Sequence, residues 1–205
     1  FLGNFRKDPI ANPLATPSGK IEIFSSTIDK FSYEDCPGHP TWMEPCEWLG
    51  AELVRKYPLH LITNQPKTRL HSQYDNGGYS LENKIREREP VSINPKDAIA
   101  RGISDGDIVR LFNDRGACLA GVIVTEDVMS GVVQLSTGAW YDPLVPGEVG
   151  SVDVHGNPNV LTIDKGTSKL AQGPSAMSAL VEVELFEDEL PPIKIFSPPE
   201  IVKGT

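Results

Sequence analysis

"DIVRLFNDRGACLAGVIV", residues 107–124, decides the fold of this chain. Two runs rich in Val, Ile and Leu flank the tetrapeptide Asn113-Asp114-Arg115-Gly116. Asn, Asp and Gly are the residues that tight turns favour, and β-branched residues are enriched in strands. The stretch therefore predicts a β-hairpin.

Short apolar segments of the same kind recur on both sides of this hairpin. Residues 59–62 and 90–93 precede it, and residues 132–136 and 179–184 follow it. A short helix is expected over residues 94–102, because Asn94 suits an N-cap, Pro95 the first helical position and Gly102 the stop. Many short strands with only short helices between them indicate a mainly β fold with a barrel core.

The two ends of the chain are typical of extended arms. Residues 16–25 predict a turn followed by a short alternating strand. Residues 31–50 carry large aromatic side chains without a sustained period, and these would form an unexplained apolar patch unless they lie on a larger body. We expect an arm over residues 1–50 that contacts the rest of a larger protein, a barrel over residues 51–190 and a Pro-rich strap over residues 191–205.

Composition and charge limit the classes of function. The chain has 205 residues, of which 39% are apolar and 23% charged, as in a soluble globular protein. No apolar stretch approaches the roughly 20 residues that a membrane span needs. The net charge of -9 argues against a broad basic face for nucleic acid. The chain begins with Phe1 rather than Met, which is typical of a piece of a longer protein.

The cysteine and histidine content argues against a metal site built by this chain alone. The three cysteines form no Cys-x-x-Cys pair, so neither a disulfide framework nor a zinc site is expected. Four histidines are too few for a histidine-based metal cluster. Cys118 lies in an alternating apolar segment and is expected to be a small buried residue.

Three polar stretches interrupt the strand pattern: residues 63–73 (TNQPKTRLHSQ), 136–143 (STGAWYDP) and 155–173 (HGNPNVLTIDKGTSKLAQG). Between Leu53 and Gln73 there are four basic residues and no acidic one, which favours a small anionic ligand over a polymer. Lys67 and Arg69 suit a phosphate group. Asn, Gln, Ser and Thr offer the donors and acceptors that read the edge of a purine or pterin ring.

Each polar stretch also has a purely structural interpretation. Asn157-Pro158-Asn159 taken alone is more typical of a turn, Trp140 of a core or lid residue, and His71 of a satisfied buried histidine. All three stretches nevertheless follow strands of one barrel, and loops at the same rim of a barrel converge on a single site. No hydrolase or nucleotide-binding glycine motif is present, so the residues indicate binding before catalysis.

Further stretches resemble a known family together with the three polar ones: TPSGKIEIFS (16–25), REPVSINPKDAIARGISDGDIVRLFNDRG (88–116) and GVVQLSTGAWYDP (131–143). Taken together, they resemble the C-terminal portion of the dimethyl sulfoxide reductase family of molybdenum enzymes. The resemblance is greatest to its biotin sulfoxide, trimethylamine N-oxide and dimethyl sulfoxide reductase branch. It implies a six-stranded double-psi β-barrel with short helices and extended N- and C-terminal arms. It also implies a bis(molybdopterin guanine dinucleotide) cofactor, with molybdenum ligated by a residue outside this chain.

The resemblance further implies which residues contact the cofactor. The loop after the first barrel strand approaches the pterin and phosphate groups, the Asn of the NVLT element is a further contact, and a polar residue in the following loop is another. The implied contacts are Thr63, Asn64, Gln65, Lys67, Arg69, Leu70, His71, Ser72, Gln73, Asn159 and Gln172. No catalytic or metal-ligating residue is assigned here.

The resemblance implies part of an oxidoreductase that reduces an S-oxide or N-oxide, with the biotin sulfoxide reductase-like members as the nearest group. The fragment alone is expected to be inactive, and its expected partners are the cofactor and the remaining domains of the same enzyme. The expected compartment is the cytoplasm, with the periplasm as the alternative. A free-standing double-psi barrel that acts as a protein-interaction module is the alternative function, because a fold does not dictate a function.

Overall fold

The computed structural model describes residues 2–175 and 178–198. It forms two compact units. The N-terminal unit comprises Phe1–Glu44 and Gly166–Gly173, and the barrel unit comprises Pro45–Lys165 and Pro174–Thr205. Each unit is described by itself.

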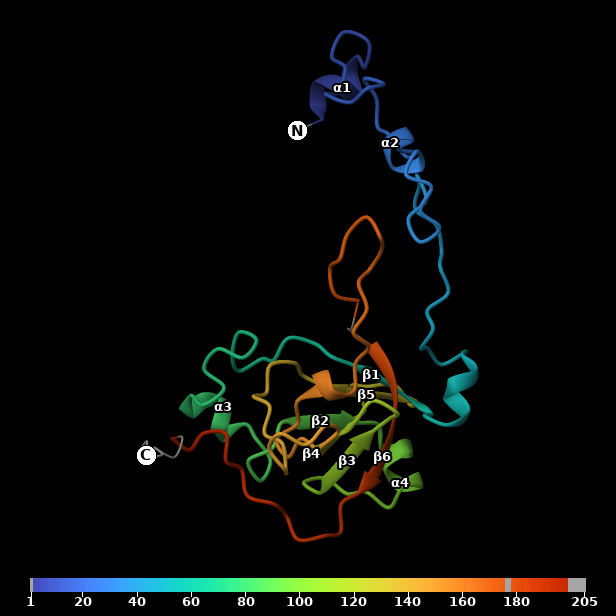
Figure 1. Cartoon of the computed structure of the whole chain (residues 1–205). Coiled ribbons are helices and arrows are strands. Elements are labelled where there is room, and N and C mark those ends of the chain that lie inside the picture. The colour runs from blue at the N-terminus through green and yellow to red at the C-terminus, as the bar shows by residue number, and fades with distance from the viewer. Residues whose placement is uncertain (1, 176–177, 199–205) are drawn as a thin grey trace, which may run out of the picture. The chain divides into compact units, whose positions relative to one another are not determined.

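The barrel unit contains six strands that close on themselves in the order β1-β5-β2-β4-β3-β6 (Figure 1). Strands β1 and β5 pair in parallel, as do β2 and β4, whereas the remaining neighbours are antiparallel. The expected six-stranded double-psi barrel is confirmed. The strands are β1 (Leu59–Ile62), β2 (Pro90–Ile93), β3 (Ile108–Phe112), β4 (Ala117–Val124), β5 (Val132–Leu135) and β6 (Ser178–Leu185).

The hairpin expected over residues 107–124 is formed by β3 and β4. Leu111 pairs with Cys118 and Phe112 with Ala117, and the backbone N–H of Asn113 donates to the carbonyl of Gly116 at 3.0 Å across the turn. Cys118 is fully buried, as its apolar surroundings predicted.

One continuous core fills the barrel. It is built from inward-facing side chains of all six strands, and Leu161 from a loop completes it. A smaller apolar cluster outside the barrel joins Ile108, Leu119 and Val154 to Leu190 and Ile193 of the C-terminal segment. Burial of apolar area on this scale is the main stabilising contribution to such a domain.

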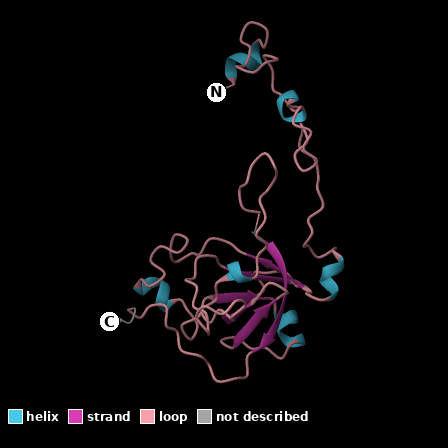
Figure 2. Cartoon of the chain, viewed as in Figure 1, coloured by secondary structure: helices cyan, strands magenta, loops and turns pink. Residues whose placement is uncertain are grey.

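The helices are short (Figure 2), and α3, α4 and η2 lie in connections between strands. Helix α4 (Pro95–Ala100) begins after Asn94, whose side chain accepts the Lys96 backbone N–H, and Gly102 follows it with a φ of 66°. The expected helix is therefore confirmed with its caps. The other short helices of this unit are η1 (Glu52–Arg55), α3 (Gly78–Glu82) and η2 (Pro158–Val160). None of the helices within the described residues is long and apolar enough to cross a membrane.

The N-terminal unit has two short helices, α1 (Gly3–Lys7) and α2 (Ser26–Asp29), and its backbone is otherwise irregular. The turn expected within residues 16–25 forms, with the Gly19 N–H donating to the Thr16 carbonyl at 2.9 Å. The expected strand after it is wrong: residues 20–25 pair with no other strand of the described chain. Alternation alone does not make a strand, because strand backbone groups need a neighbouring strand to bond to.

The C-terminal strap, defined here as residues 186–198, leaves β6 and runs along the outside of the barrel (Figure 1). It has no regular secondary structure. The last seven residues of the strap expected over 191–205 lie outside the described residues.

Candidate functional site

The loop that follows β1, residues 63–75, lies against the loop that follows β5. We call residues 63–75 the site loop. The Thr137 N–H donates to the Asn64 carbonyl at 2.9 Å, and the Ser136 hydroxyl donates to Asn64 Oδ1 at 3.2 Å. Because β1 and β5 run in parallel side by side, both loops leave the same end of the barrel. Two of the three polar stretches are thereby brought together.

The site loop has a strained backbone that its neighbour supports. His71 and Tyr74 have φ values of 51° and 61°, which non-glycine residues rarely adopt. Gly138 packs so closely that a Cβ there would lie 2.1 Å from the His71 carbonyl oxygen. Next to it, the Trp140 indole N–H donates to the Ser72 carbonyl at 2.7 Å. The loop after β5 thus supports the strained conformation of the site loop through these contacts.

Four buried charges, two of them from the site loop itself, form a group that we call the charge cluster. Arg69 pairs with Asp75 at 3.3 Å and with Glu89 at 3.1 Å, and Lys84 pairs with the same carboxylates at 2.9 and 2.8 Å. All four side chains are at most 4% exposed. Two cations alternate with two anions, so the cluster is formally neutral and each charge has two opposite neighbours, which compensates its desolvation.

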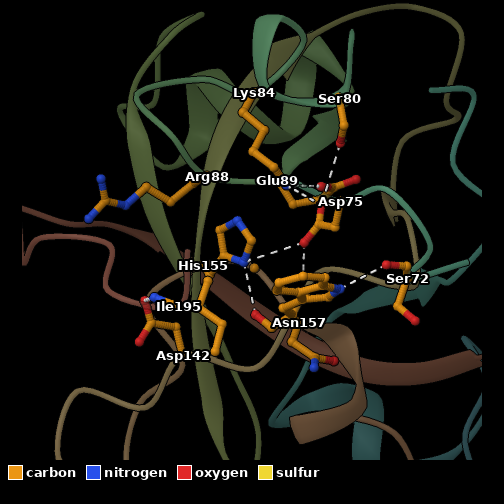
Figure 3. Close-up of polar contacts among 12 residues, drawn as sticks. Ser72, Asp75, Ser80, Lys84, Arg88, Glu89, Asp142, His155, Asn157 and Ile195 are labelled. Atoms are coloured by element: carbon orange, nitrogen blue, oxygen red, sulfur yellow. Dashed lines mark hydrogen bonds and ion pairs between the residues drawn. The ribbon is translucent and has the colours of Figure 1, made fainter. Parts of the chain in front are cut away.

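Asp75 connects the charge cluster to the surrounding segments. It accepts the Trp140 backbone N–H at 2.8 Å and the Ser80 hydroxyl at 3.4 Å, and dashed lines in Figure 3 join it to Ser80 and His155. Burial raises the pKa of Asp75, but the hydrogen bond and charge of Lys84, the Trp140 N–H and the Arg69 charge outweigh burial and lower it overall. Asp75 is therefore a carboxylate at neutral pH.

His155 lies beside Asp75 and is fully buried. Its Nδ1 is 2.8 Å from the Trp140 carbonyl, which only accepts, so Nδ1 carries the proton. Burial and the nearby charge of Lys84 lower the pKa of His155. Its Nε2 has no hydrogen-bond partner among the described residues, and a proton there would be an unsatisfied donor. His155 is accordingly neutral in the folded protein.

Asp153 fixes the start of the third polar stretch. Its side chain accepts the backbone N–H groups of Asp142, Gly156 and Asn157 at 2.6–2.8 Å, and of His155 at 3.3 Å. Burial raises the pKa of Asp153 to about 6 against the opposing effect of these four donors. The carboxyl group thereby holds residues 155–157 next to the loop that follows β5.

A pocket of about 190 Å³ opens between the site loop and the charge cluster. Arg69 and Lys84 line it but are already paired with carboxylates, whereas Lys67 is exposed and has no ion pair within the described residues. Amide and hydroxyl groups supply the other polar atoms. The polar lining residues are Asn64, Lys67, Thr68, Arg69, Ser80, Asn83, Lys84, Glu89, Ser92, Gln134 and Ser136.

A larger pocket of about 620 Å³ lies at β3, β6 and the strap. Its rim carries Glu184, Glu187, Asp188 and Glu189, with Arg110 paired to Glu184. This charge disfavours an anionic ligand, so the smaller pocket is the better candidate for the ligand that the sequence predicts.

The structure brings most of the predicted contact residues to one region. Asn64, Lys67 and Arg69 line the pocket, and the neighbouring Thr63 is buried. Gln65 contacts His71 at 3.0 Å, and the Gln73 N–H donates to the Leu70 carbonyl at 2.9 Å. Within the site loop, Leu70, His71, Ser72 and Gln73 are exposed.

Two predicted contacts lie elsewhere in the fold. Asn159 is exposed on η2, where its backbone N–H donates to the side chain of Asn157 at 2.9 Å. Gln172 belongs to the N-terminal unit, and its amide donates to the Ser168 carbonyl at 2.6 Å. The turn interpretation of Asn157-Pro158-Asn159 holds as well, since Asn157 caps η2.

Sequence reasoning missed the charge cluster and its attachments. Asp75, Lys84 and Glu89 are buried and paired, yet nothing local distinguishes them from solvated charges. A weak signal existed for Asp75, which lies only two residues beyond the predicted contact loop. Among the described residues, no group of three or more His, Cys, Asp or Glu side chains could hold a metal ion.

Comparison with known proteins gives one consistent result. Residues 59–180 match the family model "Molydopterin dinucleotide binding domain". The chain is 51% identical over 199 residues to a dimethyl sulfoxide/trimethylamine N-oxide reductase of Cereibacter sphaeroides, covering 96% of this chain and 24% of that protein. It is 50% identical over 201 residues to a trimethylamine-N-oxide reductase of Haemophilus influenzae, covering 98% of this chain and 24% of that protein.

A solved structure agrees on the fold. Acetylene hydratase from Pelobacter acetylenicus superimposes with a TM-score of 0.68 at 21% identity, covering 87% of this chain and 25% of that chain. The chain spans about a quarter of the length of the curated relatives it matches.

Proposed function

We propose, on the premise that this chain belongs to the Molydopterin dinucleotide binding domain family, that it closes over the cofactor of an S-oxide or N-oxide reductase. The cofactor of such an enzyme is a molybdopterin guanine dinucleotide that carries molybdenum. The observation that carries the proposal is the pocket lined by the site loop and the charge cluster, which combines amide and hydroxyl groups with Lys67, a cation that has no ion pair in the part of the chain the structure describes.

The residues of this pocket fit the proposed cofactor. A dinucleotide has an anionic pyrophosphate, for which Lys67 is available. It also has heterocycle edges that alternate donors and acceptors, which the Gln134 amide and the remaining hydrogen-bonding capacity of Asn64 and Ser136 could meet. The pocket is smaller than the roughly 300–1,000 Å³ of complete small-molecule sites. This size supports a site that other domains of the enzyme complete.

We assign the residues of this chain a binding and orienting role. When bound, the cofactor would supply the redox chemistry of oxide reduction. Lys67 would neutralise phosphate charge, the Asn64 side chain would hydrogen-bond a ring edge, and Arg69 would hold the site loop through Asp75 and Glu89. Asn159 is proposed as a further contact from η2.

The substrate class follows from the relatives, which are named as reductases of dimethyl sulfoxide and trimethylamine N-oxide. We propose an S-oxide or N-oxide as the substrate of the whole enzyme. A biotin sulfoxide reductase-like specificity is the narrower proposal, and relative rates with biotin sulfoxide, dimethyl sulfoxide and trimethylamine N-oxide would decide it. Turnover of only the last two would reject the narrower proposal.

The test of cofactor binding uses the full-length enzyme, purified from a host that makes the guanine dinucleotide cofactor. Lys67→Ala and Asn159→Ala should each lower the molybdenum and guanine nucleotide content per chain, because each removes a proposed contact. The loss of a charge-assisted contact corresponds to about 1.5–3 kcal/mol of binding free energy.

Lys96→Ala is the matched control, because Lys96 is exposed on α4 and lies outside the pocket. Circular dichroism and unfolding midpoints should be the same for all three variants. Unchanged molybdenum and nucleotide contents in both Lys67→Ala and Asn159→Ala would refute the proposed site.

The mass and molybdenum content of the native gene product test the wider proposal. A long chain with about one bound molybdenum is expected for a cofactor enzyme. A chain of this length without metal would instead support the protein-interaction module. We also propose a cytoplasmic location, which the three free cysteines support, and cell fractionation would test it.

A further inference from the structure

The C-terminal strap is attached to the barrel by two buried side chains. Asp142, which is 5% exposed, accepts the backbone N–H groups of Lys194 at 2.6 Å and Ile195 at 3.0 Å through one carboxylate oxygen. The buried guanidinium of Arg88 donates to the Pro191 carbonyl. Charge-assisted bonds to consecutive backbone N–H groups fix both the position and the direction of a segment. The strap is therefore held in register at residues 191–195.

This attachment places Phe196 next to Trp140 in the loop that follows β5. The Phe196 ring lies 5.6 Å from the Trp140 ring and meets the His155 ring edge to face at 5.0 Å. Aromatic pairs at such distances attract each other beyond their burial of apolar area. Phe196 thus packs against the ring whose N–H reaches the site loop.

Hydrogen bonds to Asp75 of the charge cluster, to His155 and to the site loop fix the position of Trp140. Its backbone N–H donates to Asp75, its carbonyl accepts from His155, and its indole N–H donates to the Ser72 carbonyl. With the backbone held in this way, the orientation of the indole depends on what packs against the ring, and Phe196 is such a neighbour.

We propose that Phe196 and Trp140 are positioning residues for the site loop: the strap orients the Trp140 indole, and its N–H holds the Ser72 peptide in the strained conformation of the binding-competent loop. Residues with φ near +51° and +61° persist only when surrounding contacts enforce them. The proposal rests on the proposed function for the nature of the ligand. The mechanical connection from strap to loop is independent of the ligand.

The test measures amide hydrogen exchange of residues 70–77 in the full-length enzyme prepared without cofactor. The Gln73 and Gly77 N–H groups report on the loop, because they donate to the Leu70 and Tyr74 carbonyls at 2.9 Å. Phe196→Ala and Trp140→Phe should each accelerate exchange there, on the order of tenfold, because opening of the loop becomes easier. Trp140→Phe keeps an aromatic ring and removes only the indole N–H.

Ile193→Ala is the matched control. Ile193 is a strap residue that packs on the outer cluster with Ile108, Leu119 and Val154. Its truncation removes apolar packing but keeps the Asp142 and Arg88 hydrogen bonds that hold the strap in register, and it keeps the Phe196 ring. Exchange in residues 70–77 should stay at the wild-type rate in this variant. Phe196→Tyr should restore protection, since it keeps the ring.

A second readout is retention of the guanine nucleotide and molybdenum during dialysis of the loaded enzyme. It should fall in Phe196→Ala and Trp140→Phe and be normal in Phe196→Tyr and Ile193→Ala. Wild-type exchange rates in both Phe196→Ala and Trp140→Phe would overturn the proposal, as would equal acceleration in Ile193→Ala. Exchange could be faster in Phe196→Ala and Trp140→Phe while Lys67→Ala and Asn159→Ala keep normal cofactor contents. That combination would refute only the proposed function.

Discussion

Arg69 and Lys67 are two residues apart, and the structure gives them different roles. Both were predicted to contact a phosphate, and only Lys67 is left without a carboxylate partner among the described residues. Arg69 is paired with Glu89, twenty positions away by number, so no local pattern could reveal the pairing. Residue type and loop membership were predictable from the sequence. Burial and pairing were not, because they depend on distant segments, and the contacts to the cofactor stay predictions.

Asp75→Asn should lower the free energy of unfolding by about 3–5 kcal/mol, because it leaves two buried cations with one carboxylate. Guanidinium denaturation of the purified chain would measure the change. Asp114→Asn serves as the control, since that aspartate forms an exposed ion pair with Lys56, and it should change stability little. A loss in Asp75→Asn no larger than in the control would contradict the buried cluster.

His155 predicts a loss of stability in acid. Its folded-state pKa is lowered, mainly by burial, whereas the unfolded chain has the ordinary value near 6.5. The neutral form stabilises the fold above that value, and the contribution is lost as the pH falls through about 6.5. Asp153 acts in the opposite direction, since its raised pKa of about 6 favours the protonated folded state.

Comparing the wild type with His155→Gln isolates the contribution of the histidine to the pH dependence of stability, because Asp153 is present in both proteins. The decrease in unfolding free energy between pH 7.5 and pH 5 should be smaller in the variant than in the wild type. Equal decreases in the two proteins would show that His155 does not titrate differently on unfolding.

At the scale of elements, local patterns predicted what local forces determine. Asn94, Pro95 and Gly102 bound α4 because capping acts over a few residues, and the hairpin of β3 and β4 follows from its turn. Residues 20–25 have a strand pattern but no partner strand, so the strand does not form. The close contact of the two loops after β1 and β5 depends on the parallel pairing, which no single segment specifies.

Gly138→Ala tests the contact between these two loops. The new Cβ would lie 2.1 Å from the His71 carbonyl oxygen, and Gly138 has a φ of 93°, so the loops must separate. We expect a loss of several kcal/mol in unfolding free energy, from backbone strain and the clash together. Gly147→Ala is the matched control, because its φ of 83° imposes similar strain while no atom lies within 4 Å of the new Cβ.

Thermal or denaturant unfolding of the two glycine variants separates the two effects. Strain alone should lower stability by about 1–3 kcal/mol in Gly147→Ala. Similar losses in both variants would mean that the contact between the loops contributes little.

At the scale of the whole molecule, the barrel fold was predictable from strand number and turn chemistry. The division into these two compact units was not predicted. Residues 166–173 belong to the N-terminal unit although they lie far from it in sequence, and no local pattern indicates this. The chain spans about a quarter of its curated relatives, and its candidate pocket is small. Both facts support a binding part rather than a complete catalyst.

The 205-residue chain alone is expected to reduce no oxide. Assays with a reduced dye as electron donor and dimethyl sulfoxide or trimethylamine N-oxide as acceptor would measure this. The full-length enzyme loaded with molybdenum is the positive control. Measurable turnover by the isolated chain would overturn the role assigned to it.

The position of β6 has a consequence for synthesis on the ribosome. This strand lies between β1 and β3, so the sheet cannot close into a barrel until residue 185 has emerged from the exit tunnel. Pairings between segments so distant in sequence form slowly compared with local structure. The nascent chain therefore carries β1 with an open edge from the synthesis of residue 62 until residue 185 has emerged, and a chaperone could bind this edge. All residues that line the candidate pocket precede residue 137, so its lining is translated before the strand that closes the barrel.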